Sequence, residues 1–337
     1  MNNHSSIVTR QSSIRASAPG SLMLLGEHAV LHGRRALVCA IDQRITVQSF
    51  QCLEKVLRID SELGQYEAPL DNLVDHPDFR FVLDVVKQYP QENGLELKID
   101  SDFSSDIGFG SSAAVTVATH AALMQSPRSW TSATEEDHCR AGAETPPLDK
   151  EKLFKRSLAT IHRVQGRGSG ADVAASVFGG VIAYRADPLE IQNVGQASRL
   201  PFPLTAVYSG SKMKTVDVIK IVEKQRNADP EKYERIFDEM DASVGWVVDD
   251  FESLGEQLTL NQRLMENMGL CNDALAEIIQ KFQALETPAK ISGSGLGDCA
   301  IGLTASTGLL ASGGEDRPFG NFPAYALRVE PQGVVAE

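Results

Sequence analysis

Cysteine is scarce in this sequence, and no spacing between cysteines suggests a bridge or a metal site. Five occur among 337 residues, an odd number, at scattered positions and without a Cys-x-x-Cys pair. Disulfide frameworks of small secreted proteins and zinc sites both need paired cysteines. We therefore expect free thiols and a reducing, cytoplasmic environment.

The sequence also lacks long apolar segments. No run approaches the ~18 residues that a membrane-spanning helix needs. The polar, Ser-rich residues 1–15 lack the apolar region of a signal peptide. We therefore expect no association with a membrane.

Basic residues are fewer than acidic residues. The chain has 32 Lys and Arg against 45 Asp and Glu, so its formal net charge is −13. Nucleic acids and anionic membranes favour basic surfaces, and we expect neither as a partner. A small anionic ligand is still allowed, because a local site needs only helix dipoles and a few cations.

Length and composition indicate a globular protein of about two domains. Hydrophobic residues make up 42% of the chain and charged residues 23%, which are ordinary values for folded proteins, and a domain averages roughly 150 residues. The composition changes over residues 187–203. We therefore expect an N-terminal domain of residues 1–187 and a C-terminal domain of residues 188–337.

Hydrophobic periodicity predicts strands mixed with helices in both halves, which is typical of an α+β fold. Asp149 is expected to cap a helix that runs to about residue 165. Residues 126–147 are expected to form an exposed loop. The expected strands cover residues 36–41, 45–50, 56–59, 95–99, 181–184, 204–208, 289–293, 299–303 and 325–329, and the other helices 79–86, 113–123, 215–225 and most of 233–282.

A first glycine loop, Ile107-Gly-Phe-Gly-Ser-Ser-Ala-Ala114, leads into an Ala- and Val-rich helix. The first N–H groups of a helix lack acceptors and lie at its positive end, and glycine lets an anion approach the backbone. The loop therefore predicts a phosphate site, where a serine hydroxyl could bind Mg²⁺. A plain turn with a serine cap is the alternative. The spacing fits neither the Rossmann nor the Walker A pattern.

Two further glycine segments have a polar residue at their end. Gln165-Gly-Arg-Gly-Ser-Gly-Ala-Asp172 places an aspartate at a helix start, where it could accept a proton or serve as a simple cap. Ser292-Gly-Ser-Gly-Leu-Gly-Asp298 lies between two apolar segments near the C-terminus. Loops from both halves could close over one triphosphate, although the second could also be a flexible hairpin.

Together these segments resemble the GHMP kinase superfamily, named for galactokinase, homoserine kinase, mevalonate kinase and phosphomevalonate kinase. Residues 17–33, with the core Gly26-Glu-His-Ala-Val-Leu-His-Gly33, are similar to the first motif of its mevalonate kinase branch, as are residues 260–269. Residues 107–114 resemble the ATP-phosphate loop, residues 168–180 the catalytic-aspartate segment, and residues 291–300 the C-terminal glycine motif. All of these matches follow the family's order.

The resemblance implies a ribosomal-protein-S5-like N-terminal domain and a ferredoxin-like C-terminal domain, with ATP and Mg²⁺ bound between them. It implies ATP-dependent phosphorylation of the primary alcohol of mevalonate to 5-phosphomevalonate in isoprenoid biosynthesis, and it is compatible with a homodimer. The alternatives are phosphomevalonate kinase, another GHMP small-molecule kinase, or a non-catalytic protein of the same fold.

The resemblance also assigns site residues. Asp172 would orient or deprotonate the acceptor hydroxyl, and Ser112 and Glu27 would bind Mg²⁺. The nucleotide phosphates would contact Gly108, Phe109, Gly110, Ser111, Ser112 and Ala113. The substrate would contact Glu27, His28, Thr215, Gly293, Ser294 and Gly295.

Two positions depart from the family pattern. Ser21 stands where the family usually has a lysine after Pro-Gly, so another cation is needed at this site. The candidates in the sequence are Arg163, Arg167, Lys212 and Lys214. Each of them could also be an ordinary surface charge. No carboxylate lies between residues 153 and 170, where mevalonate kinases usually have a Mg²⁺-binding glutamate. Thr160, Ile161 and His162 occupy that neighbourhood.

Overall fold

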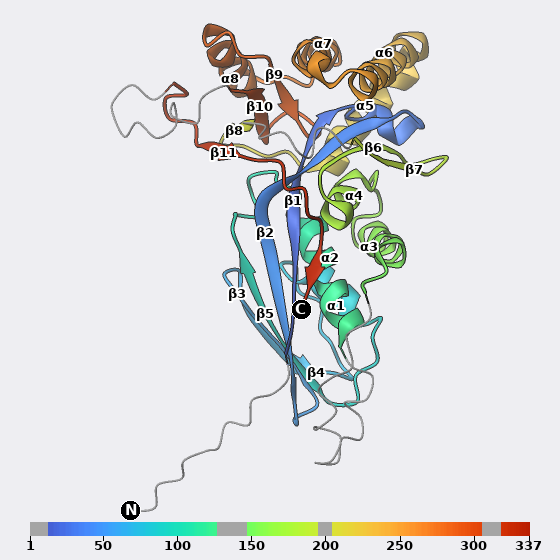
Figure 1. Ribbon diagram of the computed structural model, residues 1–337, viewed down its shortest axis with the longest axis vertical. Coiled ribbons are helices and arrows are strands. Elements are labelled where there is room, and N and C mark those ends of the chain that lie inside the picture. Colours follow the sequence, from blue (N-terminus) through green and yellow to red (C-terminus); the bar gives the residue numbers. More distant parts are fainter. Residues whose placement is uncertain (1–12, 127–146, 195–203, 305–317) are drawn as a thin grey trace, which may run out of the picture.

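The computed structural model describes residues 13–126, 147–194, 204–304 and 318–337. Within these ranges the chain forms two units, each a sheet with helices packed on it, one above the other in Figure 1. The mixture of strands and helices in both units confirms the expected α+β fold. The loop expected at residues 126–147 lies almost entirely outside the described residues.

The larger unit is an eight-stranded sheet, counted over the described residues, with α1 to α4 packed on one side (Figure 1). Its strands follow the order β12-β1-β2-β5-β3-β4, and the β3–β5 pair is parallel. Strand β6 also pairs with β2, and β7 pairs with β6. The strands are β1 (Ser13–Leu25), β2 (Ala36–Cys52), β3 (Val56–Ser61), β4 (Gly64–Pro69), β5 (Gly94–Ser101), β6 (Val181–Arg185), β7 (Glu190–Asn193) and β12 (Val335–Ala336). The helices are α1 (Arg80–Val86), α2 (Ser111–Gln125), α3 (Lys150–Gln165) and α4 (Ala171–Phe178).

The smaller unit has an antiparallel sheet in the order β11-β8-β10-β9. Helices α7 and α8 contact its strands, and α6 reaches across to the larger unit. Its elements are β8 (Leu204–Tyr208), α5 (Thr215–Ala228), α6 (Pro230–Asp249), α7 (Leu254–Asn267), α8 (Asp273–Ala284), β9 (Ala289–Ser292), β10 (Cys299–Leu303) and β11 (Ala324–Leu327), with short 3₁₀ turns η1 (Ala29–His32) and η5 (Phe251–Ser253).

Local side-chain chemistry sets where several helices begin. The Asp149 carboxylate accepts a hydrogen bond of 3.0 Å from the Lys152 N–H, which confirms the expected cap of α3. Asn272 caps α8 in the same way through the Leu275 N–H, at 3.0 Å. Each cap satisfies an N–H group that the first turn of a helix leaves without a partner.

Small residues hold α2 in the middle of the larger unit. Ten of its fifteen residues are buried, and the helix contacts β1, β2 and the three neighbouring helices. Close packing on every side leaves the helix little freedom to shift. Its N-terminus, with the first glycine loop, is therefore held in a fixed place beside β1.

Most expected elements are present, but the long strands differ. The two strands expected at residues 36–41 and 45–50 form one continuous strand, β2, of 17 residues. Strand β1 was not expected, because Pro19 and Gly20 interrupt its apolar pattern; the structure accommodates them with a shift of register between Pro19 and Ser21. The short strands β4, β7 and β12 were not expected either, since they carry little periodicity.

The end of the chain returns to the larger sheet. Ile41 bridges Val329, β12 pairs with β1, and Arg15 and Glu337 exchange two backbone hydrogen bonds of 2.9 and 2.8 Å. The larger sheet also extends to β7, which ends at Asn193. The strand that precedes the smaller unit in the sequence, β7, and the strand that follows it, β12, therefore both belong to the larger sheet. The domain boundary at residue 187 stays a prediction. None of the described helices has the length and apolar character required to span a bilayer.

Candidate functional site

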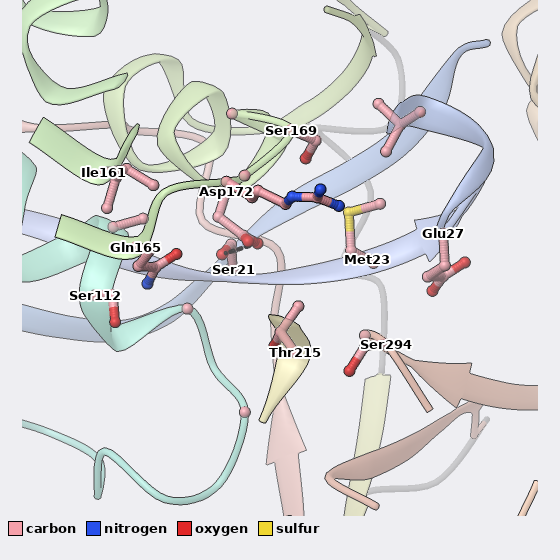
Figure 2. Close-up of a pocket in the computed structure, with 18 of the residues that line it drawn as sticks. Ser21, Met23, Glu27, Ser112, Ile161, Gln165, Ser169, Asp172, Thr215 and Ser294 are labelled. Carbon is pink, nitrogen blue, oxygen red and sulfur yellow. Dashed lines mark hydrogen bonds between the residues drawn. The ribbon is translucent and has the colours of Figure 1, made fainter. Parts of the chain in front are cut away.

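A cleft lies where the two units meet, and all three glycine segments line it. The larger unit contributes β1, the glycine loop before α2 and the turn between α3 and α4; the smaller unit contributes the start of α5 and the β9–β10 loop. Figure 2 shows Asp172 and Ser21 near the centre, Ser112 at the start of a helix, and Glu27 and Ser294 farther along. The cleft thus joins segments that are distant in the sequence.

The first glycine loop is shaped by two left-handed residues, Gly108 with φ of 73° and Gly110 with φ of 68°. A β-carbon on Gly110 would lie 2.1 Å from the Ser21 Oγ, so the loop needs glycine there. The Ser21 N–H donates a hydrogen bond of 3.0 Å to the Phe109 carbonyl oxygen and fixes the loop on β1. The loop therefore presents the N-terminus of α2 to the cleft, and a helix N-terminus is chemically suited to an anion.

Asp172 lies in the first turn of α4 and is half-buried beside Ser21. The Ser21 hydroxyl donates a hydrogen bond of 2.8 Å to the Asp172 Oδ1. Burial raises the pKa of Asp172, while the Ser21 hydrogen bond and the charge of Lys212 lower it. The preceding turn is held by Tyr184, whose hydroxyl donates a hydrogen bond of 2.6 Å to the Ser169 carbonyl oxygen. A carboxylate so placed can accept a proton from an alcohol in the cleft.

Glu27 is ion-paired with a residue of the smaller unit. The Lys290 ammonium donates hydrogen bonds to the Glu27 Oε1 and the Ile291 carbonyl oxygen, and both charged side chains are buried. Burial raises the pKa of Glu27 and lowers that of Lys290, while their mutual attraction opposes both shifts. The Glu27 Oε2 is buried without a hydrogen-bond partner among the described residues and can receive one from a ligand.

His28 connects the first motif to the third glycine loop. Burial lowers the pKa of His28 to about 4, so the imidazole is neutral at pH 7. Its Nε2 lies 2.9 Å from the Ser294 carbonyl oxygen, which can only accept, and the Nε2 therefore carries the proton. The Ser294 hydroxyl is buried in the cleft, with no hydrogen-bond partner in the described part of the chain.

Two more hydrogen bonds join the units near this end of the cleft. The Ser292 hydroxyl donates to the Met23 carbonyl oxygen at 3.0 Å, and the Gly26 N–H donates to the Asn261 Oδ1 at 3.4 Å. Together with the Glu27 and His28 contacts they form the motif-one junction, the set of four polar contacts between residues 23–28 and the smaller unit.

Two of the expected site residues do not line the cleft. Phe109 turns its ring into the core against Phe103 and Tyr325, and Gly295 packs closely against Leu270. The cleft is lined by the other expected residues, namely Gly108, Gly110, Ser111, Ser112, Ala113, Glu27, His28, Asp172, Thr215, Gly293 and Ser294. The Phe109 carbonyl oxygen still fixes the first glycine loop on β1, so the part of Phe109 is structural in this geometry.

The two departures from the family pattern both lie at the cleft. Ser21 contacts Asp172 directly, and the apolar Ile161 lines the cleft near Gln165 (Figure 2). Thr160 is buried, and its hydroxyl oxygen accepts hydrogen bonds from Gln88 and Arg163. His162 contacts the Gly168 carbonyl oxygen through its Nε2 at 2.9 Å. None of these side chains supplies the missing carboxylate.

The four possible replacement cations occupy different places. Arg163 is ion-paired with Asp84 of α1, and Lys214 precedes α5 and is not among the lining residues. Arg167 lines the cleft but is ion-paired with Glu223. Lys212 lines the cleft with its Nζ 3.5 Å from the Asp298 Oδ1. Lys212 thus differs from the other three candidates, because it lines the cleft and its carboxylate partner lines the cleft as well.

Sequence reasoning missed Lys290 and Asp298 as parts of the site. Lys290 stands alone in the apolar segment Ala289–Ser292, and a lysine inside a buried strand needs a partner. That signal could have found it. Asp298 ends the third glycine segment, which was expected to close over a triphosphate, but nothing in that segment assigned the carboxylate itself a part in the site.

Comparisons with known proteins identify the family. The model described as "GHMP kinases N terminal domain" matches residues 79–180, "GHMP kinases C terminal" matches residues 246–311, and "Galactokinase galactose-binding signature" matches residues 2–48. The mevalonate kinase of Archaeoglobus fulgidus is 35% identical over 86% of this chain and 91% of its own length. That of Pyrococcus furiosus is 29% identical over 86% and 88%.

Solved structures share the two-unit architecture. The mevalonate kinase of Methanococcus jannaschii superposes with a TM-score of 0.76 at 20% identity, covering 95% of this chain and 99% of its own. The Lin0012 protein of Listeria innocua gives a TM-score of 0.78 at 19% identity, covering 97% and 99%. At these identities the structures support the fold, and the expected two-domain architecture is confirmed. The family models match an N-terminal and a C-terminal segment of this chain, and the Archaeoglobus fulgidus enzyme matches most of its length. The chain therefore belongs to the GHMP kinase family.

Proposed function

We propose that this chain is an ATP-dependent mevalonate kinase, which phosphorylates the primary alcohol of mevalonate to 5-phosphomevalonate in isoprenoid biosynthesis. The observation that carries the proposal is the placement of Asp172 in one cleft with a helix N-terminus built for phosphate. The choice of mevalonate rests on the relatives that are named mevalonate kinase, which match 86% of the chain. A cytoplasmic location and a homodimer stay predictions of the sequence.

The nucleotide phosphates would bind the glycine loop and the first turn of α2. Gly108 and Gly110 open the backbone, and the N–H groups of Ser111 and Ser112 lie at the positive end of the helix. Ala113 adjoins them, with its own N–H donating to the Gly110 carbonyl oxygen at 3.0 Å. A protein of net charge −13 can hold a triphosphate here because dipoles and N–H groups act locally.

The protein side chains in the cleft would bind Mg²⁺ only if a nucleotide supplied further ligands. No cluster of three or more His, Cys, Asp or Glu side chains suited to a metal occurs in the described ranges. Mg²⁺ in kinases takes most of its ligands from phosphates and water, with few from protein. The Ser112 hydroxyl and the unpartnered oxygen of Glu27 are the proposed protein ligands, and the ion would neutralise charge on the transferring group.

Asp172 would accept the proton of the substrate hydroxyl or orient it toward the γ-phosphate. This needs the ionised carboxylate, which the Ser21 hydrogen bond and the Lys212 charge favour against the effect of burial. His28, neutral and fixed on the Ser294 carbonyl oxygen, holds the third glycine loop in place. The hydroxyl groups of Ser294 and Thr215 would hydrogen-bond the substrate, which Glu27 would contact beside the ion. Gly293 and Gly295, both with positive φ, would shape the loop that covers it.

A substrate panel tests the assignment. We expect ADP release with mevalonate and none above background with phosphomevalonate, homoserine or galactose, measured by a coupled assay. Galactose belongs in the panel because the galactose-binding signature matches residues 2–48. Turnover of another alcohol without turnover of mevalonate would overturn the proposal in favour of another GHMP kinase.

Gly110→Ala should weaken nucleotide binding by about ten-fold or more. A side chain in the left-handed region costs roughly 1–2 kcal/mol, and the added β-carbon would collide with the Ser21 Oγ at 2.1 Å. Fluorescence titration with an ATP analogue measures the affinity. Gly166→Ala is the matched control, because Gly166 has a similar φ of 76° but open space around it. Equal losses in both variants would contradict the proposed phosphate loop.

A further inference from the structure

The cleft is rich in carboxylates and poor in available cations. Asp172, Asp298 and Glu27 all line it. Among the described residues that line it, the lysine and arginine side chains are those of Arg167 and Lys212, and Arg167 is ion-paired with Glu223 of α5. Within the described ranges, a triphosphate entering the cleft would therefore meet Lys212, whose ion-pair partner, Asp298, also lines the cleft.

Lys212 reaches from the smaller unit toward the phosphate loop. It lies between β8 and α5, and its Nζ is 3.5 Å from both the Asp298 Oδ1 and the Ser105 carbonyl oxygen of the larger unit. The charge of Lys212 lowers the pKa of Asp172. Its side chain is 37% exposed, so the ammonium can turn toward a ligand.

Asp298 is rigidly placed to hold this ammonium. Its N–H donates to the Ser211 carbonyl oxygen at 2.8 Å, and its own carbonyl oxygen accepts from the Ser209 N–H at 2.9 Å. These bonds tie the third glycine loop to the segment that carries Lys212. The Asp298 carboxylate lies against Gly108, where a β-carbon would be 3.0 Å from its Oδ1. That oxygen is buried with no hydrogen-bond partner in the described part of the chain.

We propose that Lys212 contacts the phosphates of the bound nucleotide and places its positive charge where it acts on Asp172, and that Asp298 is the positioning residue that holds the Lys212 ammonium beside Gly108. Lys212 would thus supply the positive charge that Ser21 cannot. An unpartnered carboxylate beside the phosphate loop would repel the nucleotide, whereas a carboxylate paired with lysine presents the ammonium to it. This inference rests on the proposed kinase function.

Lys212→Gln tests the inference, and Lys214→Gln is its matched control. The control removes the same charge two residues away, at a residue that does not line the cleft. We expect Lys212→Gln to weaken nucleotide binding and lower kcat/KM by about ten- to one-hundred-fold, Lys212→Arg to restore most of both, and Lys214→Gln to behave as wild type. Equal effects of the two glutamine variants would overturn the proposal.

The pH dependence of kcat/KM distinguishes an electrostatic role of Lys212 from a purely structural one, because a structural role would leave the profile unchanged. Without Lys212 a pKa-lowering charge is lost, so the acidic limb of kcat/KM should shift to higher pH in Lys212→Gln. Ser21 bonds Asp172 directly, and the charged and titratable groups that share the cleft with Asp172 and are unchanged in the variant are Glu27, His28, Arg167 and Asp298. An unmoved limb would show that Lys212 does not act on Asp172.

Asp298→Asn tests the positioning role. Asn tolerates the left-handed backbone of this position, whose φ is 62°, so the loop should keep its shape. We expect a smaller loss than in Lys212→Gln, and no further loss when the two changes are combined. Additive losses would contradict the pairing. If wild type binds the nucleotide analogue but phosphorylates no alcohol, the proposed function fails, while the affinities still decide the role of Lys212.

Discussion

Asp172→Asn is expected to abolish phosphoryl transfer and leave nucleotide binding unchanged. The amide oxygen of asparagine can still accept the 2.8 Å hydrogen bond from the Ser21 hydroxyl, so the local geometry should persist. An amide cannot take up the proton of the substrate alcohol, and losing a general base typically costs about 10²–10⁴-fold in rate. Mevalonate-dependent ADP release and titration with a fluorescent ATP analogue measure the two properties separately.

Asp149→Asn is the matched control for this variant. It makes the same chemical change at the cap of α3, outside the cleft, and asparagine caps helices as well as aspartate does. Wild-type turnover is expected from the control. If wild type and Asp172→Asn both released ADP only at background while binding the nucleotide, the result would support the alternative of a non-catalytic GHMP-fold protein.

Lys290→Met is expected to produce the largest loss of stability, about 3–5 kcal/mol in the free energy of unfolding. The side chains of Lys290 and Glu27 are 0% and 2% exposed. Removing the lysine leaves the Glu27 carboxylate buried without a compensating charge. Urea denaturation at neutral pH, followed by circular dichroism, measures the change.

Two further variants separate the charge from the packing. Glu27→Gln combined with Lys290→Met should recover much of the lost stability, because no buried charge then remains. Lys87→Met breaks the exposed Lys87–Asp75 pair and should change stability by no more than about 1 kcal/mol. A Lys290→Met protein as stable as wild type would show that the pair is not ionised in the native state.

The parts of the site that the sequence predicted are local ones. The glycine loop at residues 107–114 and the aspartate after Gly170 could be predicted because helix starts, left-handed glycines and caps depend on adjacent residues. The helix capped by Asp149 was predicted for the same reason. Spacing along the chain could not show that Ser21 bonds Asp172 across 151 positions, or that Glu27 pairs with Lys290 across 263.

The fold shows the same division between local and distant information. Alternating residues in β5 predicted a strand, since one face of it is buried. The continuity of β2 and the return of β12 to β1 depend on pairings between distant strands, which leave no mark in the sequence of either strand. Lys212 illustrates the limit for function, because the chain offered four cations and only the folded geometry distinguishes them.

The motif-one junction has a mechanical consequence. Four polar contacts join the two units at the end of the cleft that holds Glu27 and His28. A rotation of one unit against the other that preserved these contacts would have its axis there, and its amplitude would grow with distance from that axis. Such a motion would have to alter the contacts that join the units elsewhere, among them those of the Lys212 ammonium with the Ser105 carbonyl oxygen and of the Cys299 thiol with the Ile107 carbonyl oxygen.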